Sequence, residues 1–169
     1  MEIKKIYFDL DGVMADFERG VFELCGLDPF SHEDDHVAGF DDNMWEKIKA
    51  IGHFYDKLEL MPGAKELFDD LYAKYGDKCE ILSGIPKPKR GITTAGEDKR
   101  NWVRRMLSKD VRVNIVYKED KPDYCTGRDC ILIDDLPANI IAWEKMGGTG
   151  IINTGAEDTR EILQKMDIL

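Results

Sequence analysis

The residues best suited to chemistry are acidic and hydroxyl side chains that close short apolar runs. Asp9 and Asp11 stand at the end of the run 3–10, Ser83 follows the run 79–82, and Asp134 and Asp135 follow the run 130–133. Carboxylates brought together repel one another unless a hard cation binds them, and Mg²⁺ with its oxygen ligands is the usual solution. A single Asp is more often a helix cap or turn residue, but the whole set favours a Mg²⁺ site.

The apolar runs predict the sheet that must bring these residues together. Runs at 3–10, 79–82, 111–116, 130–133 and 150–152 are too short for helices and alternate with helical patterns at about 64–72, 102–107 and 137–146 and after residue 153. Strands that alternate with helices predict an α/β fold, a Rossmann-like parallel sheet with helices on both faces. Ligands of such sheets bind beyond the carboxyl ends of the strands, where these acidic residues stand.

One segment does not follow this alternation. Residues 17–60 mix aromatic and acidic residues with helical patches and show no strand signal, and the stretch is too long for an ordinary connection. We therefore expect a core domain made of residues 1–16 and 61–169, with a small helical cap inserted after the first strand at 17–60.

Composition narrows the classes of partner. The 169 residues carry a formal net charge of -10, which disfavours nucleic acid polymers and anionic membranes. No window approaches the roughly 20 apolar residues of a membrane span, the first residues lack a secretory pattern, and the four cysteines form no CxxC pair. These features predict a soluble, cytoplasmic protein. The sequence carries no signal for its oligomeric state.

Three motifs resemble the signatures of the haloacid dehalogenase superfamily. They are FDLDGVMAD at 8–16, ILSG at 81–84 and ILIDD at 131–135, in the family's order across nearly the whole chain. The resemblance implies that Asp9 attacks phosphorus and that Asp11 acts as general acid and then base. It also implies that Mg²⁺ bridges the Asp9 carboxylate, the Asp11 carbonyl and the acid of the last motif, Asp134 or Asp135.

The middle motifs of the family supply phosphate contacts. The resemblance implies that Ser83 donates a hydrogen bond to a phosphoryl oxygen, with Gly84 beside it among the substrate-binding residues. A lysine should balance the charge of the nucleophile and the phosphate, and two candidates exist. Lys121 in DKPDY is favoured for this role, with Lys99 as a second phosphate or substrate contact.

Within the superfamily, the chain resembles the 5'(3')-deoxyribonucleotidases. The resemblance rests on DGVMADFE at 11–18, on the aromatic pair before LELMPGAKEL, and on a lysine followed three residues later by tryptophan at 99–102. It implies a nucleoside monophosphate substrate whose base stacks on cap aromatics, with Phe17, Phe40, Trp45 and Tyr55 as the candidates. The chain departs from the family at ILSGIP and YKEDKP.

Two other interpretations stay open. The substrate could be another small phosphate ester. A phospho-accepting receiver module also combines an acidic pair, an Asp, a hydroxyl residue and a lysine on a parallel sheet. A receiver carries its acidic pair after the first strand, whereas here DxDG comes first and the acidic pair comes last. This order favours the phosphatase.

Overall fold

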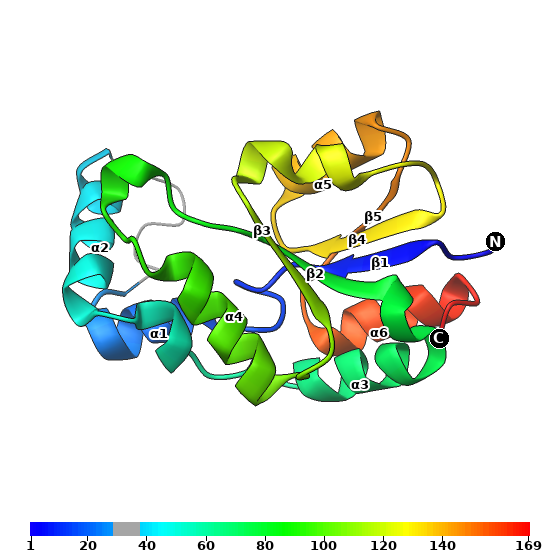
Figure 1. Cartoon of the computed structure of the whole chain (residues 1–169), viewed down its shortest axis with the longest axis horizontal. Helices are drawn as coiled ribbons and strands as arrows, with labels where there is room; N and C mark the ends of the chain where they lie inside the picture. The colour runs from blue at the N-terminus through cyan, green and yellow to red at the C-terminus, as the bar shows by residue number, and fades with distance from the viewer. Residues whose placement is uncertain (29–37) are drawn as a thin grey trace.

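A parallel sheet of five strands in the order β3-β2-β1-β4-β5 forms the middle of the molecule in the computed structural model (Figure 1). The structure describes the backbone of residues 1–28 and 38–169 and the side chains of residues 1–28 and 42–169. The strands are β1 (Lys5–Phe8), β2 (Cys79–Gly84), β3 (Arg112–Val116), β4 (Cys130–Asp134) and β5 (Thr149–Ile152). Every neighbouring pair is parallel, so all strands end at the same edge.

Helices cover both faces of this sheet. On one face lie α3 (Ala64–Tyr75), α4 (Ala95–Met106) and α6 (Ala156–Lys165), and on the other lie α5 (Pro137–Lys145) and η5 (Lys118–Tyr124). Two short 3₁₀ turns, η3 (Gly76–Lys78) and η4 (Pro88–Arg90), complete the connections. The predicted α/β architecture is thus confirmed.

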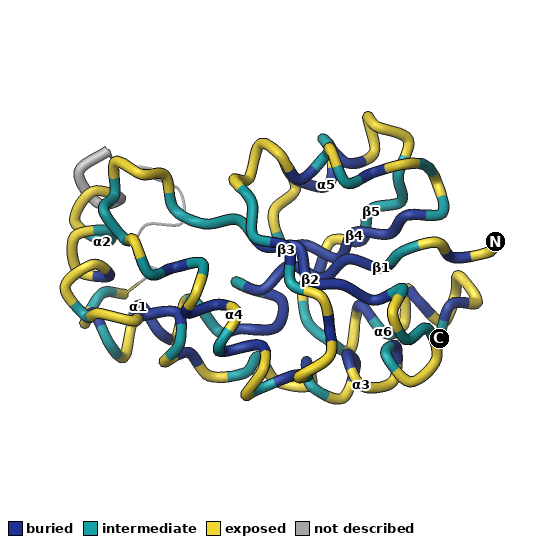
Figure 2. The backbone as a smooth tube through the Cα atoms, viewed as in Figure 1, coloured by how far each residue is buried: buried dark blue, intermediate teal, exposed yellow. Residues whose placement is uncertain are grey.

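The strands read as continuous apolar runs because both sides of the sheet are buried. Successive side chains point to opposite faces, so Phe8 packs on Phe68 of α3 while its neighbour Tyr7 packs on Trp143 of α5. The ring centroids of these two pairs are 5.4 and 5.5 Å apart, respectively. Figure 2 shows β1, β2 and β4 buried along their lengths, with the exposed residues on the surrounding helices and loops.

In the part of the chain that the structure describes, the helical segments between β1 and α3 are α1 (Phe17–Cys25), α2 (Ala38–Ile51) and the 3₁₀ turn η2 (Phe54–Lys57). They stand to one side of the sheet (Figure 1). Where the chain leaves and rejoins the sheet, Asp16 N donates to Glu59 O and Met61 N donates to Met14 O, both at 2.8 Å. The division into a core and a cap at 17–60 stays a prediction, and these two hydrogen bonds lie at its boundary.

None of the helices in the described part of the chain is long and apolar enough to cross a membrane.

Candidate active site

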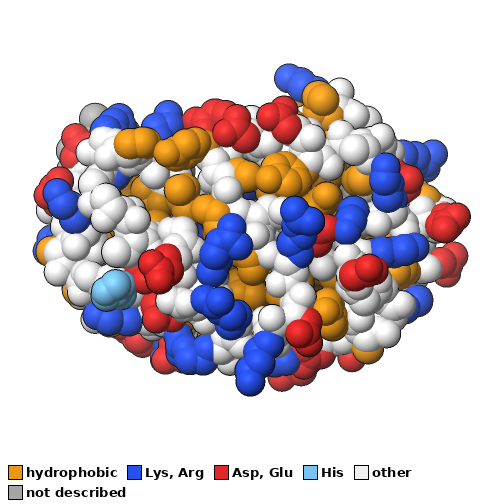
Figure 3. All heavy atoms as spheres, in the orientation of Figure 1, with side chains coloured by type: hydrophobic (Ala, Val, Ile, Leu, Met, Phe, Trp, Pro, Cys, Tyr) orange, Lys and Arg blue, Asp and Glu red, His pale blue; other side chains and the backbone are white. Residues whose placement is uncertain are grey.

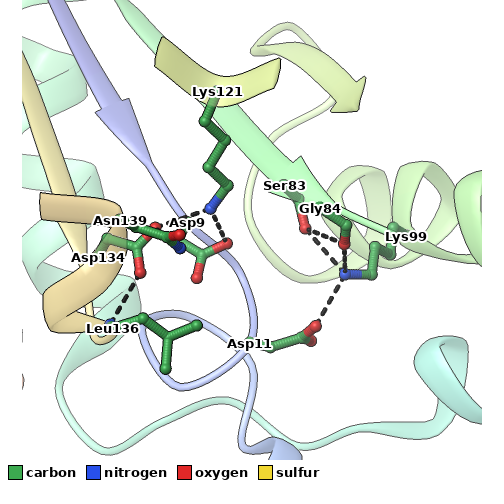
Figure 4. A network of polar contacts seen from close by, with 9 residues as sticks. All are labelled: Asp9, Asp11, Ser83, Gly84, Lys99, Lys121, Asp134, Leu136 and Asn139. Carbon is green, nitrogen blue, oxygen red and sulfur yellow. Dashed lines mark hydrogen bonds and ion pairs between the residues drawn. The ribbon is translucent and has the colours of Figure 1, made fainter. Parts of the chain in front are cut away.

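The carboxyl ends of β1, β2 and β4 bring the acidic and hydroxyl residues singled out in the sequence to one edge of the sheet. Asp9 directly follows β1, Ser83 lies near the end of β2 and Asp134 ends β4 (Figure 4). The strand order turns back at β1, between β2 on one side and β4 on the other, and such a switch point is where doubly wound sheets open a crevice for ligands.

A tight turn after β1 carries Asp11 to the other side of this edge. The amides of Val13, Met14 and Ala15 all donate to the Leu10 carbonyl. Gly12 has φ of +79°, and a Cβ there would lie 2.1 Å from Asp135 Oδ2. Gly12 is therefore required both for the left-handed backbone and for the close approach of Asp135.

Lys121, which lies on η5, forms an ion pair with Asp9, the candidate nucleophile. Its ammonium lies 3.0 Å from Asp9 Oδ1 and 2.7 Å from Asp134 Oδ2, and the side chain is 4% exposed. Asp134 is further fixed by the Leu136 amide at 2.9 Å and by Asn139 Nδ2 at 3.0 Å. Burial lowers the pKa of Lys121, but the carboxylates of Asp9 and Asp134 outweigh burial and place its pKa above the ordinary value.

Lys99 occupies the opposite side of the site, from α4. Its ammonium donates to Asp11 Oδ2 at 2.8 Å, to Ser83 Oγ at 2.9 Å and to the Gly84 carbonyl at 2.7 Å. The structure thus places both candidate lysines in the site, each beside a different aspartate (Figure 4). Ser83 is fully buried beneath Lys99.

Asp11 is bonded through only one of its two oxygens. Oδ2 accepts from Lys99, whereas Oδ1 is buried without a hydrogen-bond partner, the single such side-chain atom among the described residues. A buried oxygen without a partner is costly unless a ligand completes it. Asp11 Oδ1 therefore has an unused hydrogen-bonding position that a ligand could complete.

The carboxylates themselves fit a divalent cation. One oxygen each of Asp9, Asp134 and Asp135 lies within 4.8 Å of the others. Burial, together with Asp9 and Asp134, raises the pKa of Asp135 to about 8, and burial raises the pKa of Asp9 to about 6 although Lys121 opposes the shift. When all four carboxylates are ionised, Asp11 included, they exceed the two ammonium groups by two negative charges. A Mg²⁺ ion, which prefers oxygen ligands, matches both the donors and the excess charge.

Three of the aromatic residues predicted to stack on a base form a cluster with one another. The rings of Trp45 and Tyr55 lie 6.4 and 6.3 Å from the ring of Phe17, and the Tyr55 ring is stacked on it. Phe17 and Trp45 are half-buried, but Tyr55 is only 3% exposed. Phe40, the fourth candidate, lies outside the residues whose side chains the structure describes.

Sequence reasoning missed Asn139 and the role of the segment around it. Asn139 lies in the first turn of α5, where Pro137 marks the helix start, and its amide reaches back to Asp134. One sequence feature could have indicated Asn139. It is a polar residue directly before the buried Ile140, on the inner side of a helix that begins two residues after the acidic pair at 134–135.

Comparisons with known proteins agree with this geometry. No family model matches the chain. A Vibrio phage KVP40 protein, provisionally named a 5'(3')-deoxyribonucleotidase, is 26% identical over 122 residues, which cover 69% of this chain and 58% of the relative. The chain therefore matches little more than half the length of that relative.

Solved structures give a fuller match in shape. A haloacid dehalogenase-like hydrolase from Streptococcus pneumoniae has a TM-score of 0.61 at 13% identity, covering 97% of this chain and 98% of that chain. A magnesium complex from Bacteroides thetaiotaomicron has a TM-score of 0.54 at 17% identity, covering 97% and 100%. A Deinococcus radiodurans hydrolase with bound phosphate and sodium has a TM-score of 0.56 at 16% identity, covering 99% and 97%. The chain has the fold of the haloacid dehalogenase-type hydrolases.

Proposed function

We propose that the protein is a magnesium-dependent phosphomonoesterase that works through an aspartyl-phosphate intermediate. The observation that carries the proposal is the pair Asp9 and Asp11, two residues apart and each held by its own buried lysine. A nucleophile and a general acid must reach the two ends of one breaking phosphorus–oxygen bond. The pairs Asp9–Lys121 and Asp11–Lys99 provide these two groups at the same sheet edge.

The residues divide the reaction between them. An Asp9 carboxylate oxygen attacks phosphorus, and the ester bond breaks as Asp11 gives its proton to the leaving oxygen. Water then attacks the phosphorus of the aspartyl phosphate, Asp11 takes the proton from that water, and the bond to Asp9 breaks. Inorganic phosphate leaves, and both aspartates return to their starting states.

The remaining groups stabilise charge and hold geometry. Lys121 balances Asp9 and Asp134, while Lys99 fixes Asp11 and stands beside Ser83, a candidate donor to a phosphoryl oxygen. Asp9, Asp134, Asp135 and the Asp11 carbonyl would hold Mg²⁺. When bound, the ion supplies positive charge that draws the anionic phosphate into a site of excess negative charge.

For the substrate, we propose a small phosphate ester, most specifically a deoxynucleoside 5'- or 3'-monophosphate. Phe17 begins α1 just after the Asp11 loop, and its ring centroid lies 6.4 Å from that of Trp45. These two half-buried rings offer flat apolar surface for a base. The provisional name of the phage relative points the same way. In this proposal residues 17–60 act as the cap over the site.

A panel of phosphate esters tests the proposal. The purified protein is assayed with Mg²⁺ against nucleoside monophosphates, sugar phosphates and an activated aryl phosphate, and again with excess chelator. We expect hydrolysis that needs Mg²⁺ and is fastest for deoxynucleoside monophosphates, and Asp9→Asn should remove it because an amide cannot form the acyl phosphate. If sugar phosphates are cleaved as efficiently as nucleotides, the nucleotidase assignment is wrong and the phosphatase assignment stands. Full activity in chelator would contradict the metal site.

A further inference from the structure

The Lys99 ammonium contacts an aromatic ring in addition to its hydrogen-bond partners. Its three N–H groups are all used, by Asp11, Ser83 and Gly84. Its side chain is 2% exposed, and the Tyr55 ring lies over it with 4.6 Å between Nζ and the ring centroid. A cation that has lost its water is attracted to the face of an aromatic ring.

With the Tyr55 ring in place, there is no room for water between it and the neighbouring side chains. The space bounded by Tyr55, Leu58, Trp102 and Lys99 is too small to admit a water molecule. The packing around the ammonium is therefore dry on the side of the inserted segment. Removing the ring would leave the ammonium beside an apolar gap, or let water in, and either change alters where Lys99 rests.

Tyr55 is held in place by the fold. Its segment is tied to α4, the helix that carries Lys99, because Trp102 Nε1 donates to the Leu58 carbonyl at 2.8 Å and Arg105 pairs with Asp56 at 2.8 Å. The ring also packs against Phe54 at 5.3 Å between centroids. Burial and the nearby Asp11 raise the pKa of Tyr55 well above its ordinary value, so the ring is a neutral phenol.

We propose that Tyr55 is a positioning residue that holds the Lys99 ammonium between Asp11 and Ser83, instead of a platform for the substrate's base. The inference rests on the proposed phosphatase function, since Lys99 matters there as the partner of the general acid. Tyr55 is nearly inaccessible, which leaves Phe17 and Trp45 as the half-buried rings for a base.

The test compares two substitutions. Tyr55→Phe keeps the ring, whereas Tyr55→Leu keeps an apolar side chain without an aromatic face. We expect kcat of Tyr55→Leu to fall about tenfold to thirtyfold for both a deoxynucleoside monophosphate and an aryl phosphate, with Tyr55→Phe close to wild type. Phe68→Leu, at an equally buried ring in α3, controls for general loss of stability and should leave kcat unchanged. If Tyr55→Leu does not fold, Tyr55→Met takes its place.

A second measurement needs no substrate. In protein with ¹³C-labelled lysine, the Lys99 ε-methylene signal, assigned by its loss in Lys99→Met, should show a ring-current shift in wild type and in Tyr55→Phe. In Tyr55→Leu the signal should move to the ordinary lysine position. An unmoved signal in Tyr55→Leu would overturn the proposal, as would a higher Michaelis constant for the nucleotide alone with kcat intact. If no ester is hydrolysed by wild type, the proposed function fails. The two ε-methylene protons of Lys99 then still decide whether Tyr55 positions it, because they become equivalent in Tyr55→Leu if the ammonium is released and stay distinct if it remains fixed.

Discussion

Two aspartates two residues apart lie in very different surroundings. Asp9 is 6% exposed and bonded to Lys121, while the Asp11 side chain is 28% exposed and bonded to Lys99 through one oxygen. These surroundings suit different tasks: a fixed nucleophile for Asp9, and for Asp11 an acid with one oxygen free for the leaving group. The proposed roles can therefore be separated by the leaving group of the substrate.

Asp11→Asn should lose activity unevenly. A general acid contributes roughly 10²–10⁴-fold when the leaving oxygen needs a proton. We expect kcat for a nucleoside monophosphate to fall by about that factor, and kcat for an activated aryl phosphate to fall much less. Asp9→Asn is the matched control and should lose nearly all turnover of both. Equal losses on the two esters in Asp11→Asn would argue against the acid role.

Lys121 should contribute to the stability of the fold as well as to catalysis. Its substitution by Met would leave Asp9 and Asp134 buried without their cation, and breaking a buried ion pair typically costs about 3–5 kcal/mol. We expect the free energy of unfolding of metal-free Lys121→Met, measured by denaturant titration, to drop by about this amount. Lys118→Met, at an exposed position in the same turn, should change it by less than about 0.5 kcal/mol. Equal effects of the two substitutions would show that the buried pairing contributes nothing.

At the scale of elements, the five strands and the main helices were predictable because a sheet buried on both faces leaves short, continuous apolar runs. The carboxylate cluster was predictable for a related reason, since parallel strands end at one edge. The pairing of each lysine with its aspartate could not be predicted from the sequence. Lys99 meets Asp11 across 88 positions of sequence and Lys121 arrives on an irregular turn, so no local pattern pairs either lysine with its aspartate.

The different burial of the aromatic residues in segment 17–60 was equally hidden from the sequence. Aromatic residues in short helices look alike whether they face a ligand or the core, and only packing separates the buried Tyr55 from the half-buried Phe17. The same packing identifies α1 as the element that places an aromatic side chain close to the Asp11 loop, because Phe17 is its first residue and Asp16 is its N-cap.

Phe17→Ala should weaken nucleotide binding selectively. Stacking of a base on an aromatic ring contributes roughly 1–3 kcal/mol, or about ten- to a hundredfold. We expect the Michaelis constant for deoxynucleoside monophosphates to rise by this factor, with little change for a small generic ester. Phe22→Ala, at a largely exposed ring on the same helix, is the control. If Phe17→Ala affects both esters alike, the aromatic cluster does not recognise a base.

At the scale of the whole molecule, an acidic chain concentrates further negative charge in its site. The formal net charge is -10, yet the edge of the sheet gathers four carboxylates around two lysines. Figure 3 shows lysine and arginine side chains gathered in the middle of the face over α4 and β3. The arginines and lysine that line the 560 Å³ hollow there are Arg100, Arg104, Lys109 and Arg112. None of these residues belongs to the site, so the proposed Mg²⁺ ion would balance the charge of the site carboxylates.

The stability of the metal-free protein should therefore depend on pH in an unusual direction through Asp9 and Asp135. Their pKa values in the folded protein are about 6 and about 8, above the ordinary 3.8. The folded state then binds more protons than the unfolded state, so these two groups lower stability as pH rises from about 4 to about 8.

Thermal unfolding in the presence of chelator measures this dependence. The difference in melting temperature between Asp135→Asn and wild type should grow in favour of the variant as pH rises from 5 to about 8, because the amide removes one of the crowded charges. Mg²⁺ at about a hundred times its dissociation constant should stabilise wild type at pH 8 by about 2.7 kcal/mol, and Asp135→Asn by less at the same concentration. A difference between the two proteins that stays constant with pH, together with equal stabilisation of both by Mg²⁺, would show that Asp135 is neither crowded by its neighbours nor a ligand of the ion.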